Sequence, residues 1–190
     1  MNGLILASAS PRRRELLEQM GLSGFIVRPA LDEIEADYLP PAEAVQAIAL
    51  AKGQAVAETA KAGELVLAAD TEVWFEGKLL GKPKDQADAT RMLKGLSGAR
   101  HTVYSGVALI LDGKVLTDVE ETDVYFRDLS HAEIEAYVAG GEPMDKAGAY
   151  GIQGKAAHFV RRIEGDVYNV IGLPLCLVHE LTQKMGVCLF

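Results

Sequence analysis

The chain has 190 residues, of which 49% are hydrophobic and 24% are charged, and this is enough for one domain with a full core, spanning residues 1–190. The formal net charge of −8 argues against the broad basic surface that binding to nucleic acid or to an anionic membrane requires. No stretch reaches the roughly 18 to 20 apolar residues of a membrane span, so we expect a cytoplasmic protein.

Residues 3–21 are expected to contain a strand, a short turn and a helix. Leu4 to Ala7 form an unbroken apolar run without helical periodicity, which is typical of a strand buried on both faces. Ser10 is suited to the N-cap of the helix and Pro11 to its first position, while Gly21 is suited to end it.

Three arginines, Arg12, Arg13 and Arg14, follow this N-cap. They lie in the first helical turn, where the positive end of the helix dipole disfavours cations. Their presence makes sense if an anion binds there, because free backbone N–H groups, serine hydroxyls and arginine side chains together suit a phosphate chain. The alternative is that the arginines face water as a solubilising surface.

An acidic loop follows a second short strand expected at residues 25–27. Its carboxylates are Asp32, Glu33, Glu35 and Asp37. A divalent cation would relieve the repulsion among those that face the arginines; otherwise they are simply solvated. Pro40 and Pro41 indicate the start of the next helix, which is expected to run to about Lys61 and carries Lys52.

Residues 65–69 predict a buried strand that ends at Asp70 and Thr71. Open α/β sheets bind ligands beyond the carboxyl ends of their strands, so this position makes Asp70 a candidate site residue. A small hairpin is expected over residues 73–80, and Lys82 lies between a glycine and a proline in the stiff connection that follows.

Helices and hairpins alternate through the second half of the chain. We expect, in order, a helix from residue 85 or 86 to 96, a long hairpin over 101–126, a helix that begins with a capping box at Ser130 and Glu133, a glycine-rich stretch over 147–154, a last hairpin made of 159–163 and 167–170, and a closing helix over 174–185. Cys176 and Cys188 are expected to be buried, reduced thiols. These elements predict an α/β fold: a mixed β-sheet flanked by helices, in two lobes with a central cleft.

The candidate residues together fit metal-assisted chemistry on a polyphosphate. Arginines at the helix start and the lysines at positions 52 and 82 would hold phosphates. Carboxylates around Glu33 and at Asp70 would hold a divalent ion, and one carboxylate can activate water. The alternative for each lysine is a surface residue that pairs with a nearby acid.

Six short motifs are spread over nearly the whole chain: Ser8-Ala9-Ser10-Pro11-Arg12-Arg13, Ala69-Asp70-Thr71, Gly81-Lys82-Pro83, Leu96-Ser97-Gly98, the stretch from Asp145 to Gly154, and Asn169-Val170-Ile171-Gly172-Leu173-Pro174-Leu175. In this order and at these spacings they resemble the Maf family of nucleoside triphosphate pyrophosphatases. A single Ser-Pro-Arg-Arg would be a weak signal, whereas several separate motifs make coincidence implausible.

This resemblance implies an inosine-triphosphatase-like fold. It also implies hydrolysis of a nucleoside triphosphate to the monophosphate and pyrophosphate, with Mg²⁺ or Mn²⁺ as the divalent metal cation. Asp70 would be the general base and, with Glu33, would lie at the metal; because a free carboxylate is a weak base, it would act on a metal-bound water. The phosphates would be bound by Ser8, Arg13, Lys52 and Lys82.

Three positions divide the family by substrate, and here they are Arg12, Thr71 and Gln153, a combination that resembles the dTTP/UTP branch. Thymine and uracil present an N–H donor beside carbonyl acceptors, and a glutamine amide offers one of each. The alternative role of Gln153 is a structural amide that bonds the backbone. We expect both dTTP and UTP to be accepted, and modified pyrimidine triphosphates are further candidates.

Two other functions are compatible with these residues. One is a pyrophosphatase for another nucleotide, such as 7-methyl-GTP, although that branch carries other residues at the three positions. The other is a nucleotide-binding regulator of septum formation, which would act through a partner surface. The resemblance also makes a homodimer plausible.

Overall fold

The computed structural model describes residues 2–30, 36 and 39–189. Its chain divides into two compact units. The first comprises Met1–Thr71, Ser105–Glu120 and Gly172–Phe190, and the second comprises Glu72–Tyr104 and Glu121–Ile171. Two units agree with the two lobes expected from the sequence, whereas the central cleft stays a prediction.

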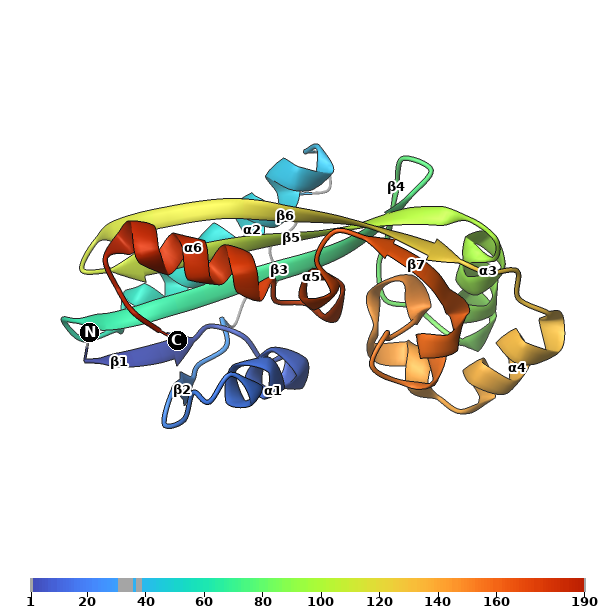
Figure 1. Ribbon diagram of the computed structural model, residues 1–190, viewed down its shortest axis with the longest axis horizontal. Helices are drawn as coiled ribbons and strands as arrows, with labels where there is room; N and C mark the ends of the chain where they lie inside the picture. Colours follow the sequence, from blue (N-terminus) through green and yellow to red (C-terminus); the bar gives the residue numbers. More distant parts are fainter. Residues whose placement is uncertain (1, 31–35, 37–38, 190) are drawn as a thin grey trace. The chain divides into compact units, whose positions relative to one another are not determined.

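Seven strands of the described residues form one mixed sheet in the order β2-β1-β3-β5-β6-β7, with β4 paired to β3 (Figure 1). β1 is parallel to β2 and to β3, whereas β4 and β7 are antiparallel to β3 and β6. The strands are β1 (Gly3–Leu6), β2 (Ile26–Val27), β3 (Glu64–Phe75), β4 (Lys78–Leu80), β5 (Arg100–Leu111), β6 (Lys114–Phe126) and β7 (Val160–Glu164). The predicted α/β class with a mixed sheet is confirmed.

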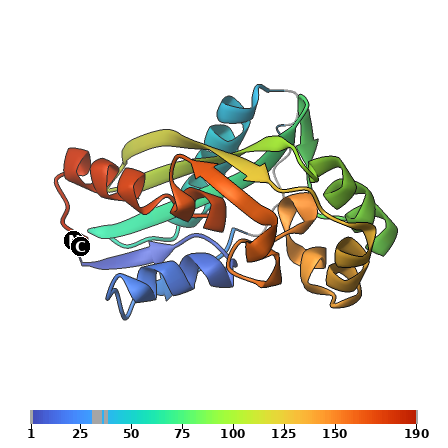
Figure 2. The same cartoon turned by 45° about the vertical axis from the view of Figure 1, so that its right-hand side comes forward.

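Six α-helices of the described residues accompany the sheet: α1 (Pro11–Gln19), α2 (Pro41–Ala57), α3 (Gln86–Leu96), α4 (His131–Ala139), α5 (Val167–Ile171) and α6 (Leu175–Met185). Three 3₁₀ helices, η1 (Glu142–Asp145), η2 (Ala147–Ala149) and η3 (Lys155–Phe159), lie between α4 and β7. In the first unit, α2 and α6 lie on opposite faces of the strands (Figures 1 and 2). None of the helices in the described ranges combines the length and the apolar character needed to cross a bilayer.

Two predicted element boundaries and one predicted element type are wrong. β3 does not end at Asp70 but continues to Phe75, because its last residues pair with β4, and Lys52 pairs with the Asp70 carboxylate within the strand. α2 ends at Ala57 rather than near Lys61, and the Thr59 hydroxyl donates to the carbonyl of Val56 in its last turn.

Residues 167–170 form the helix α5 and not the second strand of a hairpin. The Asp166 carboxylate accepts a hydrogen bond from the backbone N–H of Tyr168 at 2.8 Å, which favours a helix start over an extended chain. The prediction of buried thiols is also wrong, because Cys176 and Cys188 are both exposed.

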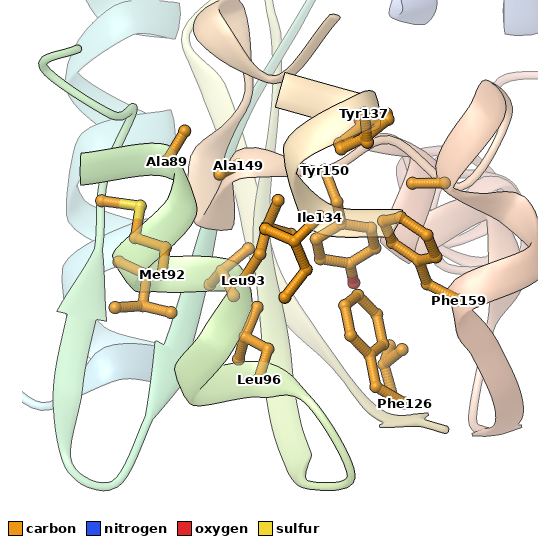
Figure 3. Close-up of a cluster of buried hydrophobic side chains, with 14 of the residues drawn as sticks. Ala89, Met92, Leu93, Leu96, Phe126, Ile134, Tyr137, Ala149, Tyr150 and Phe159 are labelled. Carbon is orange, nitrogen blue, oxygen red and sulfur yellow. The ribbon is translucent and has the colours of Figure 1, made fainter. Parts of the chain in front are cut away.

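The core of the second unit packs α3 and α4 against the aromatic side chains of Phe126, Tyr150 and Phe159 (Figure 3). His101 lies among these rings, only 2% exposed, and its Nε2 lies 2.8 Å from the Tyr150 hydroxyl. Its Nδ1 finds no hydrogen-bond partner among the described residues. Burial lowers the pKa of His101 to about 4, and the nearby Asp123 carboxylate opposes this only in part.

His101 should therefore make the protein less stable in mild acid. The unfolded chain takes up a proton near pH 6.5 and the folded one near pH 4, so stability falls as the pH falls through this window. Between pH 7 and pH 5 the loss due to this residue should be about 2 kcal/mol. Urea unfolding at both pH values should show this extra loss in the wild type and not in His101→Gln.

The exposed His131 provides the control, because His131→Gln should keep the full pH dependence of the wild type. Equal losses in the wild type and in His101→Gln would contradict the assignment.

Candidate functional site

In the first unit, strand β1 ends while the neighbouring strand β3 continues beyond it, and we call this place the step. Leu6 pairs with Leu67, and the N–H of Ala7 donates to the carbonyl of Leu67 at 2.8 Å. Carbonyl groups alternate along a strand, so the carbonyl of Ala69 points to the same edge, beyond the end of β1. Because no strand of the described residues continues β1 there, this carbonyl needs a partner from elsewhere.

Arg13 supplies that partner. Its Nη1 donates to the Ala69 carbonyl at 2.8 Å and to the Ser8 hydroxyl at 3.0 Å. Its Nε donates to the Gly172 carbonyl at 2.7 Å, and its Nη2 donates to Thr71 Oγ1 at 3.1 Å. Four of the five N–H donors of the guanidinium are thus bound by the protein, so Arg13 holds the helix start, the middle of β3 and the segment before α6 together.

The Arg13 side chain is buried, with the residue only 9% exposed. Burial lowers the pKa of the guanidinium from its ordinary value, and the neighbouring Asp70 carboxylate acts in the opposite direction. An arginine nevertheless keeps its charge in a protein. The solubilising alternative is therefore wrong for Arg13, although it describes Arg14, which is exposed and pairs with Glu18 at 2.8 Å.

Hydroxyl groups surround the guanidinium. Ser8 Oγ accepts hydrogen bonds from Arg13 and from the N–H of Ser10, which leaves its own O–H to donate. Thr71 Oγ1 lies 2.7 Å from Ser105 Oγ and donates to the Gly172 carbonyl at 3.3 Å. Ser10 is the N-cap of α1 as predicted, but its side chain makes no capping hydrogen bond.

Sequence reasoning missed Ser105 and the carbonyl of Gly172. Ser105 is completely buried in β5, between the apolar residues of that strand. The one signal in the sequence was a serine hydroxyl within an apolar run. That signal points to a site residue only when Thr71 is known to be the hydrogen-bond partner of Ser105. The role of Gly172 depends on a backbone carbonyl, which no residue pattern reveals.

Asp70 and Lys52 form an ion pair beside this network. Lys52 Nζ lies 2.6 Å from Asp70 Oδ1, and their side chains are 26% and 15% exposed. No described residue bonds the second carboxylate oxygen, Oδ2. Arg13 and Lys52 carry two positive charges and Asp70 one negative charge, so the group favours an anionic ligand.

Lys52 reaches Asp70 because α2 packs closely on the sheet. The contact between them is made by small residues: Ala49 and Gly53 of the helix against Ala68 and Ala108 of the strands. A Cβ atom at Gly106 would lie 2.2 Å from the carbonyl oxygen of Val45, so only glycine fits under the first turns of α2.

The other predicted site residues lie outside this group. Arg12 is half-buried at the start of α1. Lys82 and Gln153 are exposed residues of the second unit, where the N–H of Gly148 donates to the carbonyl of Gly81 and ties their two segments together. Glu33 lies outside the described residues.

Within the described residues, no group of three histidine, cysteine, aspartate or glutamate side chains could hold a metal ion. Mg²⁺ is typically held by one or two carboxylates together with substrate phosphates and water, and Asp70 provides one such carboxylate, whose Oδ2 is bonded by none of the described residues. The described residues therefore fit a metal bound jointly with a phosphate ligand.

Comparison with known proteins gives a consistent result. A family model described as "Maf-like protein" matches residues 3–185. A "dTTP/UTP pyrophosphatase" of Moorella thermoacetica is 54% identical over 190 residues, covering 98% of this chain and 97% of its own. One of Bacillus cereus strain AH820 is 50% identical over 184 residues, with 96% of each chain covered.

Among solved structures, a HAM1 protein from Coxiella burnetii matches with a TM-score of 0.50. The match covers 96% of this chain and all of that one, at 17% identity. At this identity the likeness concerns the fold alone, and it supports the predicted fold class.

The close packing at Gly106 leads to a prediction about stability. Gly106→Ala would push the new methyl group into the backbone of α2, so the free energy of unfolding should fall by about 1 to 3 kcal/mol or more. Gly95→Ala is the matched control, since its Cβ would lie 3.5 Å from the nearest atom, in ordinary contact, inside α3. It should leave stability unchanged or raise it by up to about 1 kcal/mol.

Denaturant unfolding of both variants measures the difference. Equal stabilities would show that α2 has room to move away from the sheet.

Proposed function

The chain belongs to the Maf family, and on this premise we propose that it hydrolyses dTTP and UTP to the monophosphate and pyrophosphate. One observation carries the proposal: the Asp70 carboxylate is held by Lys52 beside the buried guanidinium of Arg13. A protein that only bound nucleotides through cationic side chains would not need a carboxylate there, because it repels phosphates. The 54% identical relative named dTTP/UTP pyrophosphatase supports the same substrates for this chain.

In this proposal the phosphates are bound by cationic side chains and by residues at the start of α1. Lys52 presents an ammonium group, and Ser8 has an O–H left to donate. Arg13 keeps one N–H and contributes its charge, while Thr71 acts on the substrate through the orientation of Arg13. Lys82 and Arg12 add positive charge for the remaining phosphate oxygens.

Asp70 accepts the proton of the attacking water. Lys52 holds Oδ1 in place, so the carboxylate is kept in one orientation toward the water molecule. Asp70 and, in our proposal, Glu33 would also hold the divalent cation, Mg²⁺ or Mn²⁺. When bound, that ion would polarise the phosphoryl group and lower the pKa of a water molecule.

Base recognition is assigned to Gln153. Its amide offers one donor and one acceptor, which matches the N–H and carbonyl groups shared by thymine and uracil. The two bases differ by one methyl group, worth about 0.8 kcal/mol, so both nucleotides should be substrates. Modified pyrimidine triphosphates, a homodimer and a cytoplasmic location stay predictions.

The decisive experiment for the reaction is product analysis. Wild-type protein incubated with dTTP or UTP should release pyrophosphate and the monophosphate, and removal of divalent metal by EDTA should stop the reaction until Mg²⁺ or Mn²⁺ is returned. Release of orthophosphate would place the cut at another phosphorus. Absence of any turnover would favour a nucleotide-binding regulator.

Asp70→Asn tests the proposed base. The substitution keeps the size of the side chain but removes its basicity, so kcat should fall by about a thousandfold or more while nucleotide affinity stays within a few-fold. Asp118→Asn makes the same chemical change on an exposed residue of β6 and should have wild-type kinetics. Turnover of dTTP by Asp70→Asn at the wild-type rate would refute the assignment.

Gln153→Ala tests base recognition. Loss of the amide should raise KM for dTTP and UTP by about tenfold and should reduce the preference for pyrimidine over purine triphosphates by a similar factor. Steady-state kinetics with dTTP, UTP, dATP and dGTP measure both effects. An unchanged substrate profile would instead indicate that the Gln153 amide hydrogen-bonds the backbone and does not recognise the base.

A further inference from the structure

The segment that carries Gln153 has few side chains with which to hold itself in place. Residues 151–155 include Gly151 and Gly154 on either side of Gln153, and Gln153 itself is exposed. Glycine gives a chain the greatest conformational freedom, which costs entropy when the chain must keep one conformation. A rigid Gln153 therefore requires contacts from neighbouring residues.

Glu142, in the 3₁₀ helix η1, provides such contacts after Gln153. Both of its carboxylate oxygens lie 3.1 Å from the backbone N–H donor of Lys155. A Cβ atom at Gly154 would lie 2.0 Å from Glu142 Oε1. The carboxylate thus packs directly against the backbone of the residue that follows Gln153, and only glycine leaves room for it there.

Lys146 provides the contact before Gln153. A Cβ atom at Gly151 would lie 2.7 Å from Cε of Lys146, so the side chain of this lysine packs against the backbone at Gly151. Its Nζ donates to the carbonyl of Glu142 at 2.7 Å and to Asp145 at 2.6 Å, which keeps the lysine in place.

The buried core supports both contacts. The Tyr137 hydroxyl donates to Glu142 Oε1 at 3.2 Å. Burial, and then the Glu142 carboxylate, raise the pKa of Tyr137, so this hydroxyl remains a donor at neutral pH. At the other end of the segment, the Tyr150 hydroxyl lies 2.8 Å from Nε2 of the buried His101.

We propose that Glu142 is a positioning residue for base recognition: it holds the backbone at Gly154 and Lys155 so that the Gln153 amide is presented in one orientation. This inference rests on the proposed function for its substrate, the pyrimidine base. Glu142 hydrogen-bonds the backbone N–H of Lys155 and would act through the backbone, without touching the nucleotide itself. Its effect should therefore reach the base through Gln153 and leave the phosphate-binding residues of the first unit unchanged.

Glu142→Ala and Glu142→Gln test the proposal with steady-state kinetics. Glu142→Ala should raise KM for dTTP and UTP by about tenfold and reduce the preference over dGTP similarly, with kcat within a few-fold of the wild type. Glu142→Gln keeps one acceptor oxygen, so it should lie between Glu142→Ala and the wild type and provides a folded variant if Glu142→Ala unfolds. Binding of inorganic tripolyphosphate, which has no base, should be unchanged.

Amide hydrogen exchange tests the contact itself without relying on activity. The peptide over residues 151–155 should exchange faster in both variants, because the Lys155 N–H loses its acceptors in Glu142→Ala and keeps at most one in Glu142→Gln. Glu135→Ala is the matched control: this exposed glutamate of α4 pairs with His131 at 3.1 Å and should change neither exchange nor KM.

The double variant separates positioning from a general structural effect. In a Gln153→Ala background, Glu142→Ala should raise KM no further, because the amide that it positions is already absent. An independent, additive rise would overturn the proposal, as would unchanged exchange at residues 151–155. If the wild type fails to cleave dTTP and UTP, the proposed function fails, whereas binding of dTTP to the same variants and hydrogen exchange still decide the role of Glu142.

Discussion

The buried guanidinium of Arg13 is the interaction on which the first unit depends. Burying a charge is costly unless hydrogen bonds and an opposite charge compensate it, and here four bonds to oxygens and the proximity of Asp70 do so. The acceptors come from the turn after β1, the middle of β3 and the segment before α6, which are far apart in sequence. One side chain therefore determines how these three parts of the chain meet, and it does so at the step where β1 ends.

The charges of this group explain how an acidic protein could hold a triphosphate. The net charge of −8 repels polyanions at long range. Within a few ångströms, however, Arg13 and Lys52 outnumber the single carboxylate of Asp70. Since salt screens exposed charges beyond about 10 Å, the local cations would decide binding in the proposed site. In the proposed site the same group would place a carboxylate next to the phosphates, where it repels them but can activate water.

The proposed site residues of each unit are held in place by different physical means. In the first, buried charge and hydroxyl groups form a network in which each polar atom orients the next. In the second, the segment that bears Gln153 is rich in glycine, and neighbouring side chains supply the rigidity that the segment lacks. Glu142 and Lys146 can approach so closely only because Gly154 and Gly151 have no Cβ atoms. These glycines thus allow neighbouring side chains to pack closely against the backbone.

The sequence by itself determined the strongly patterned elements and the family. The apolar run before Ser8, the capping box at Ser130 and the two strands of the long hairpin over residues 101–126 are local signals, and the structure confirms them. The sequence also identified Arg13, Lys52 and Asp70 as candidate site residues, through residue types that suit phosphate chemistry and through motif resemblance. Only the tertiary structure decided that Asp70 lies within a strand, that Ser105 joins the network and that 167–171 is a helix. The physical reason is that the surroundings of Asp70 and Ser105 depend on partners distant in sequence, such as Lys52 for Asp70, 18 residues away. The helix depends on a local contact of Asp166, which competes there with an apolar pattern that also suits a strand.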